Sequence, residues 1–171
     1  LLLYESGARV TELCNVHRYD LHLEKPFTLV LHGKGNKIRS VPLDGLVVDT
    51  ISNYIQKYEV HDDDFLFFNA RRERLTREGV NYIVRKYFER ARMDAVSMYP
   101  PAISAHCLRH SKAMHLLENG VNLVYIRDLL GHASVTTTEV YSKANPEVKR
   151  KYLEDASHTL NINLGYSAEK K

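Results

Sequence analysis

One stretch between residues 28 and 43, TLVLHGKGNKIRSVPL, limits the possible fold more than any other part of the chain. Two runs of β-favouring residues flank a Gly-Lys-Gly-Asn turn, and this pattern predicts a β-hairpin. A short extended run over 20–23 is expected to add a third strand, which gives a small antiparallel sheet. Most of the remaining sequence has helical patterning, so we expect an α+β fold that is mainly α-helical, with this sheet carrying the lysine hairpin.

Helices are expected both before and after the hairpin. Residues 1–16 are interpreted as the end of a helix that carries Arg9, and residues 44–58 as a second helix. A third is capped by Thr76 and has an apolar stripe made of Val80, Ile83, Val84, Tyr87, Phe88 and Ala91. Further helices are expected over 104–119 and 122–131, each ending at a glycine, and over about 135–142 and 146–156.

Length and composition indicate a single globular domain. The chain has 171 residues, of which 44% are hydrophobic and 26% charged, and it has no run near the roughly 20 apolar residues that span a bilayer. No signal peptide is visible, so a cytoplasmic location is expected. The chain also starts without Met, which suggests a fragment of a longer protein. Cys14 and Cys107 match no metal spacing and are expected to be free thiols.

The charge distribution permits a polyanionic partner without requiring one. The formal net charge is +3, but residues 71–92 hold eight basic residues against three acidic ones. Such a run is ordinarily a solvated helix face, and it also matches the electrostatic pattern of nucleic-acid binding.

The hexapeptide HCLRHS, residues 106–111, concentrates groups that are costly to bury. On a helix beginning at Ser104, the two histidines and Arg109 are three or four residues apart and would share one face. Cys107, Met114 and Leu117 would then supply the core. A helix N-terminus beside a histidine and an arginine is typical of a phosphate site. Local capping explains the same residues, so the hexapeptide alone leaves both interpretations open.

Metal and nucleotide sites are less well supported. His106 and His110 could bind a metal with His132, but no cysteine or carboxylate completes the set, so we expect no metal. The segment GKGNK, residues 33–37, lacks the spacing of a phosphate-binding loop, so no nucleotide cofactor is expected. Taken singly, Lys34 is an ordinary turn lysine and Tyr141 an ordinary half-buried tyrosine.

Several blocks taken in order resemble the catalytic domain of tyrosine recombinases, the phage-integrase type of site-specific DNA recombinase. They are ESGARVTEL, GKGNKIRSVPL, HCLRHSKAMHLLENG and IRDLLGHASVTTTEVY. The resemblance implies a catalytic domain over 1–156 and leaves 157–171 as a C-terminal tail. By this resemblance the catalytic positions are Arg9, Lys34, His106, Arg109, His132 and Tyr141.

The resemblance also implies a reaction that uses neither metal nor ATP. Tyr141 would attack a DNA phosphodiester, forming a 3′-phosphotyrosyl link and freeing a 5′-hydroxyl. A free tyrosine has a pKa of about 10, which leaves a deficit of roughly 4 kcal/mol in phenolate at neutral pH. The family roles are distributed as follows: His106 accepts the proton, Arg9 and Arg109 stabilise the phosphate, His132 donates a hydrogen bond, and Lys34 protonates the leaving oxygen.

Double-stranded DNA is the partner that the resemblance implies. We expect contacts to it from Lys37, Arg39, Arg77 and Arg85. The family's N-terminal core-binding domain is not in this chain, so the fragment is expected to be monomeric and to bind DNA weakly, with an affinity that falls as the salt concentration rises. For the full-length protein, from a prokaryotic mobile element, we expect a homotetramer on DNA, with Leu160, Ile162 and Leu164 in the tail docking on a neighbour.

Two other functions remain open from the sequence. The stretch HLLENGVNLVYIRDLLGH, residues 115–132, has the pattern of a helix-turn-helix, so a DNA-binding module without chemistry is one alternative. A type IB topoisomerase, which has a similar active site, is the other. Relaxation of any supercoiled plasmid would indicate the topoisomerase, whereas cleavage restricted to one site would indicate the recombinase.

Overall fold

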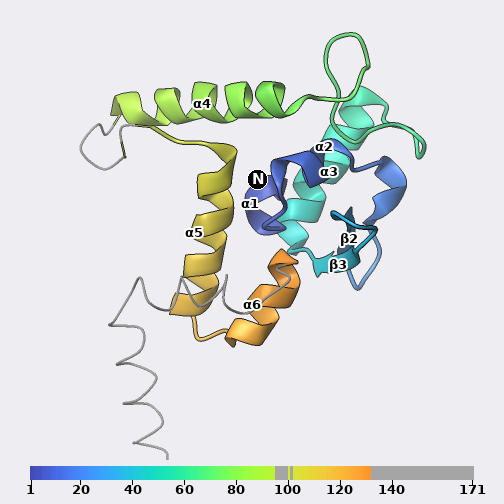
Figure 1. Cartoon of the computed structure of the whole chain (residues 1–171). Coiled ribbons are helices and arrows are strands. Elements are labelled where there is room, and N and C mark those ends of the chain that lie inside the picture. Colours follow the sequence, from blue (N-terminus) through green and yellow to red (C-terminus); the bar gives the residue numbers. More distant parts are fainter. Residues whose placement is uncertain (95–99, 101, 132–171) are drawn as a thin grey trace, which may run out of the picture.

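The computed structural model describes residues 1–94, 100 and 102–131 of the chain (Figure 1). In chain order its elements are α1 (Leu2–Glu5), α2 (Val10–Cys14), the 3-10 turn η1 (Arg18–Asp20), β1 (Leu21–His22), β2 (Thr28–His32), β3 (Ile38–Pro42), α3 (Gly45–Tyr58), α4 (Arg77–Asp94), α5 (Ala105–Glu118) and α6 (Leu123–Leu130). The described part is mostly helical with a three-stranded antiparallel sheet, which confirms the expected fold class.

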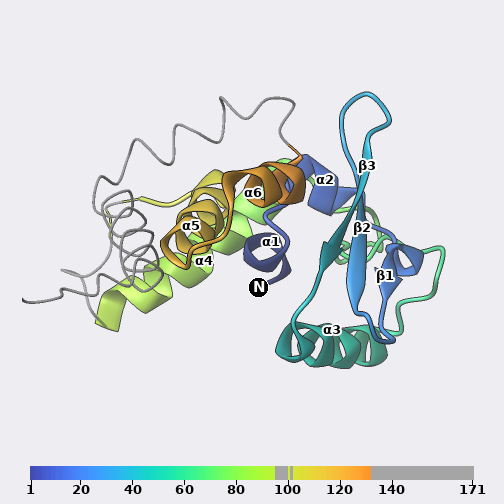
Figure 2. The ribbon, with the colours of Figure 1, turned by 90° about the horizontal axis from the view of Figure 1, so that it is seen from below.

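The sheet has the order β1-β2-β3, and its alternation decides which side is buried. Leu29 pairs with Val41 and Leu31 with Arg39, and the three apolar side chains of these pairs are fully buried in the main core. Between the strands, the chain reverses through Gly35 and Asn36, both in the left-handed region at φ 73° and 61°. The resulting hairpin projects past the helices (Figure 2).

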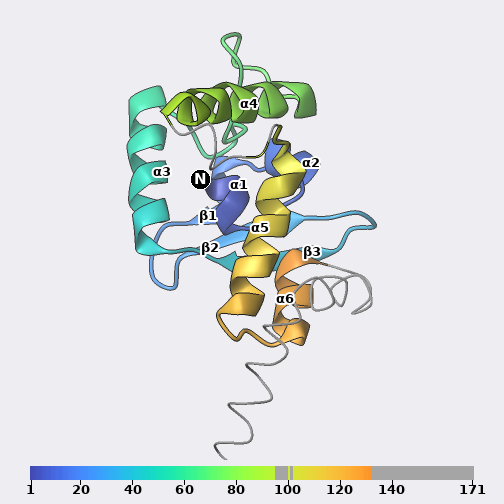
Figure 3. The ribbon, with the colours of Figure 1, turned by 90° about the vertical axis from the view of Figure 1, so that its left-hand side faces the viewer.

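The sheet with α3 lies on one side of the N-terminal segment, and the other three long helices of the described chain lie on the other side. Figure 2 shows α3 beside the sheet and α4, α5 and α6 together on the other side, with α1 and α2 between the groups. Helix α1 packs against α5, and α6 packs against both α5 and β3. Figure 3 shows that α4 crosses α5 at a steep angle. The N-terminal segment is therefore the structural link between the hairpin and α5.

Local capping explains where several helices begin and end. Asn122 accepts a hydrogen bond from the Val124 amide at 2.8 Å, and Thr76 accepts one from the Gly79 amide at 3.1 Å, both as expected. Ser104 is the N-cap of α5, but its hydroxyl contacts the Cys107 sulfur at 3.4 Å and caps no backbone amide. Gly131 ends α6 in the left-handed conformation, at φ 63°.

The expected continuous helix over residues 1–16 is wrong, because the chain breaks between Ser6 and Arg9. Gly7 has φ 57°, and a helix does not continue through the left-handed region. Ser6 is fully buried and its hydroxyl donates to the Leu2 carbonyl at 2.7 Å, which closes α1. Arg9 is therefore the N-cap of α2 and not an interior helix residue.

The expected apolar stripe on α4 is only partly buried. Val80 is 7% exposed, whereas Ile83 and Tyr87 are 40% and 62% exposed. Helix α4 makes its main contacts with α2 and α5 and extends beyond them (Figure 1), so Val80 and Val84 reach the main core while Ile83 and Tyr87 remain exposed.

The two helices expected after Gly131, together with the tail, lie outside the described residues. No helix in the part of the chain described here is long and apolar enough to cross a membrane.

Candidate active site

Arg9 is held by contacts to α2 and to the residue that ends α6. Its amide donates to Glu12 Oε2 and its Nη1 to Glu12 Oε1, both at 2.8 Å, while its Nη2 donates to the Gly131 carbonyl at 3.3 Å. The side chain remains 44% exposed. Arg9 is thus oriented by the protein and still accessible to a ligand.

A buried carboxylate connects Arg9 to the hairpin. Glu12 is 4% exposed, and Arg39 on β3 donates to both of its oxygens, from Nη1 at 3.0 Å and from Nη2 at 2.7 Å. Burial by itself raises the pKa of Glu12, but the hydrogen bonds from Arg39 and from the Arg9 amide outweigh it and lower the pKa from 4.5 to about 2. Glu12 therefore remains ionised at neutral pH and holds two arginines in register.

Arg39, which was expected to contact DNA, has its guanidinium directed to protein acceptors. Besides the two bonds to Glu12, its Nε donates to the Leu129 carbonyl at 2.9 Å, at the end of α6. The side chain is only 13% exposed, because Arg39 pairs opposite the buried Leu31 and shares its face of the sheet. The observed contacts are those of a cross-brace between β3, α2 and α6.

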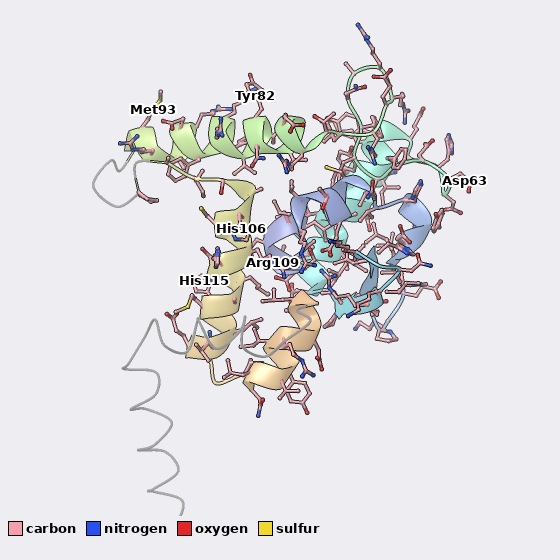
Figure 4. The ribbon with its side chains drawn as sticks, viewed as in Figure 1. Asp63, Tyr82, Met93, His106, Arg109 and His115 are labelled. Atoms are coloured by element: carbon pink, nitrogen blue, oxygen red, sulfur yellow. The ribbon has the colours of Figure 1, made fainter. Side chains whose placement is uncertain are left out.

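Arg109 lies on the inner side of α5. It is 2% exposed, and its Nη1 and Nη2 donate to the carbonyls of Gly7 at 2.6 Å and Leu130 at 2.7 Å. Figure 4 shows Arg109 extending from α5 toward α1 and α6, with His106 nearer the start of the same helix. The break at Gly7 therefore places a carbonyl where the arginine needs an acceptor.

His106 is exposed and stacks edge-on against His110, with ring centroids 4.3 Å apart. Burial, followed by the charges of His106 and Arg109, lowers the pKa of His110. His106, Arg109 and His110, which were expected to share one face of the helix, thus lie on two sides, with both histidines exposed and Arg109 buried. The core side of α5 consists of Ala105, Arg109, Ala113 and Leu117; Cys107, which was expected there, is exposed.

Arg9, His106 and Arg109 line one cavity of about 540 Å³. Arg77, at the start of α4, contributes to its wall. Arg9 also lines a second, larger groove of about 870 Å³, on whose other side lie Lys34 and Lys37. Arg9 therefore stands between the two hollows, with the α5 residues on one side and the hairpin lysines on the other.

The remaining expected DNA contacts and the expected catalytic Lys34 are on the surface. Lys34 and Lys37 are exposed at the hairpin tip, and Arg77 and Arg85 are exposed on α4. His132 and Tyr141 lie outside the described residues. Within the described ranges, no group of three or more histidine, cysteine, aspartate or glutamate side chains is arranged to hold a metal ion.

Sequence reasoning missed two residues of this region. Glu12 stands three residues after Arg9, which is the spacing of a capping box, but an arginine is an unusual cap, so the local pattern does not mark this glutamate. His32 lines the larger groove and contacts Asp20, 12 residues away. Nothing in the local sequence indicates that contact.

Comparison with known proteins gives a consistent family. The model of the protein family described as "Phage integrase family" matches residues 1–147. The chain is 40% identical over 161 residues to the tyrosine recombinase XerA of Thermococcus onnurineus, covering 91% of this chain and 53% of that protein. It is 37% identical to the tyrosine recombinase XerD of Staphylococcus haemolyticus, over 82% and 47% of the two chains. The chain thus spans about half the length of these relatives.

Solved structures agree with the sequence relatives. The crystal structure of XerA recombinase superposes with a TM-score of 0.76 at 30% identity, covering 91% of this chain and 54% of that one. The XerH site-specific recombinase, solved in a pre-cleavage complex with its difH substrate, gives a TM-score of 0.71 at 27% identity, over 82% and 40% of the chains. Because the family match covers most of the sequence and the fold agrees with it, this chain belongs to the phage integrase family of tyrosine recombinases.

Proposed function

We propose that this chain is the catalytic part of a site-specific DNA recombinase that cleaves and rejoins duplex DNA through a 3′-phosphotyrosyl intermediate. The observation that carries the proposal is the shared cavity of Arg9, His106 and Arg109, which come from two elements far apart in sequence. The similarity to tyrosine recombinases, one of them solved with its difH substrate, supports DNA as the substrate.

The two arginines are suited to stabilise a phosphate whose negative charge increases in the transition state. A guanidinium forms paired hydrogen bonds with phosphate oxygens, and fixed donors need no reorganisation when the charge develops. Arg9 is held by Glu12 and Arg109 by two backbone carbonyls, so both orientations are set before DNA binds. Removing one such donor typically lowers the rate by about 10²–10³.

The proton transfers are assigned to residues on opposite sides of Arg9. In the proposed reaction His106 accepts the phenolic proton of Tyr141, because an imidazole exchanges protons near neutral pH. Lys34 gives a proton to the departing 5′-oxygen, since the exposed hairpin tip can approach the DNA backbone. His132, which directly follows the C-cap of α6, donates a hydrogen bond to the phosphate. The energy of the broken bond is retained in the phosphotyrosine, so rejoining needs no ATP.

The decisive experiment is covalent trapping. The full-length protein and this fragment are incubated, in EDTA, with nicked duplexes made from the ends of the source element, and adducts are separated on denaturing gels. We expect an EDTA-resistant adduct that disappears in Tyr141→Phe and persists in Tyr125→Phe. Tyr125 is a matched control, because it is 70% exposed on α6 and outside both hollows.

The same assay separates the alternatives. Binding of a genuine site by the full-length protein without any adduct would refute the recombinase and favour a non-cleaving DNA-binding module. Adducts on every sequence, with relaxation of any supercoiled plasmid, would favour a type IB topoisomerase. The assignment of Lys34 has its own test: a sulfur leaving group needs no proton, so a 5′-bridging phosphorothiolate should restore cleavage to Lys34→Ala but not to Arg9→Ala.

A further inference from the structure

His32 lies at the base of the hairpin that carries Lys34, and the reaction described above makes no use of it. It is the last residue of β2, and its side chain is 51% exposed. It lines the larger groove together with Arg9 and both hairpin lysines. An imidazole at this position is therefore open to a ligand bound in the groove.

Asp20 holds one nitrogen of this imidazole. Its Oδ1 lies 3.1 Å from His32 Nε2, and its Oδ2 accepts from the His17 amide at 2.9 Å. The Asp20 side chain is 4% exposed, so the carboxylate is a fixed partner. An ionised carboxylate can only accept hydrogen bonds, so Nε2 must carry a proton and donate it.

The second nitrogen, Nδ1, has no hydrogen-bond partner among the described residues. In a neutral ring protonated at Nε2, Nδ1 is an acceptor and cannot bond to a phosphate oxygen. In the imidazolium form both nitrogens donate. Because Asp20 fixes the first proton at Nε2, an anion can bind at Nδ1 only if a second proton is taken up with it.

The charges around the groove favour such an anion. They are Arg9, Lys34, Lys37 and Arg39 against the carboxylates of Glu12 and Asp128, with Asp20 directly behind His32. The Glu12 carboxylate already accepts from two of these arginines. The four cations outnumber the two carboxylates that line the groove, so an incoming phosphate meets a net positive charge there.

We propose that His32 is a proton-linked contact for a backbone phosphate of DNA, which it binds through Nδ1 beside the Lys34 hairpin. The proposal rests on the proposed function, because its ligand is the DNA of that reaction. DNA binding should therefore take up a proton at His32 and strengthen as the pH falls. Because this one contact needs the proton while the lysine and arginine contacts do not, His32 should account for a several-fold change in the Kd between pH 6 and pH 8.

The test is the Kd for a fluorescein-labelled duplex of arbitrary sequence, measured by anisotropy near pH 6 and pH 8 at constant ionic strength. An arbitrary sequence suffices, because a phosphate contact carries no base information. The variants are His32→Gln, which keeps a neutral donor, and His22→Gln as the matched control. His22 is exposed on β1 and does not line the groove.

The ratio of the Kd at pH 8 to the Kd at pH 6 measures the pH dependence. We expect this ratio to be about fivefold larger for wild type and for His22→Gln than for His32→Gln. Histidine-selective ¹⁵N spectra of wild type near neutral pH should show Nδ1 of His32 gaining its proton when the duplex is added. If His32→Gln has the same pH dependence as wild type, or if Nδ1 stays unprotonated at saturating duplex, the inference about His32 is overturned and the proposed function is not affected. No binding by wild type or by the full-length protein at either pH would overturn the proposed function and this inference together.

Discussion

Replacing Glu12 with glutamine should cost stability in a pH-dependent manner. Glutamine has nearly the shape of the protonated acid but cannot ionise, so Glu12→Gln removes the charge and leaves the packing. The carboxylate is 4% exposed and accepts hydrogen bonds from Arg9 and Arg39. Its pKa is lowered from 4.5 to about 2, and a shift of that size corresponds to about 3 kcal/mol of stabilisation.

The direction of the pH dependence follows from the sign of the shift. A carboxylate whose pKa is lowered by folding stabilises the protein at every pH above its unfolded value, and it loses this contribution as the pH falls through the folded value. The wild type should therefore exceed Glu12→Gln by about 3 kcal/mol at pH 7. The difference should shrink below about pH 4.5 and be small near pH 2.

Urea unfolding followed by far-UV circular dichroism at several pH values measures this difference directly. Glu78→Gln is the matched control, because Glu78 is 77% exposed and its pair with Arg77 spans 3.6 Å at the surface. That variant should stay within about 0.5 kcal/mol of wild type. The reasoning is refuted if Glu12→Gln is as stable as wild type at pH 7, or if the difference between them does not change down to the acid limit.

Three further outcomes are expected. Gly131→Ala should lower the free energy of urea unfolding by about 1–2 kcal/mol more than Gly35→Ala does. Both glycines have a positive φ, but only at Gly131 would the added Cβ lie 2.9 Å from a guanidinium; equal losses would contradict this. Asn122→Ala should lose about 1 kcal/mol in the same assay, since it removes the cap of α6, and an unchanged midpoint would count against it. Cys107 should react with a thiol reagent at neutral pH much faster than Cys14, because Cys107 is exposed with its pKa lowered by the Ser104 hydroxyl while burial raises the pKa of Cys14; comparable rates, read by mass spectrometry, would be inconsistent with these surroundings.

The elements that the sequence predicts well are those that short-range chemistry decides. The hairpin over 28–43 is marked by its own glycine turn, and the start of α6 by an asparagine that accepts from an amide two residues away. Such contacts need no distant partner, so the residues themselves contain the information. The order of the motifs is equally local to the sequence, and it was sufficient to identify the family.

The arrangement of the candidate site depends on contacts that no local pattern contains. Arg109 is 102 residues from the carbonyl of Gly7 that it binds, and Arg39 is 27 residues from Glu12. An arginine in a sequence is equally compatible with a DNA contact and with a buried brace, as Arg39 demonstrates. The choice depends on whether the folded chain brings an acceptor to it at low exposure, because a guanidinium is buried only where its donors are satisfied.

The sequence by itself therefore determined the type of most elements and the family of the chain, since these follow from propensity, capping and motif spacing. Only the tertiary structure decided that the first helix breaks before Arg9, that Arg109 faces inward while His106 stays outside, and that Glu12 joins α2 to the hairpin. The physical reason is that burial and charge pairing depend on which distant segments meet, and the free energy of a buried ion pair exists only once they have met.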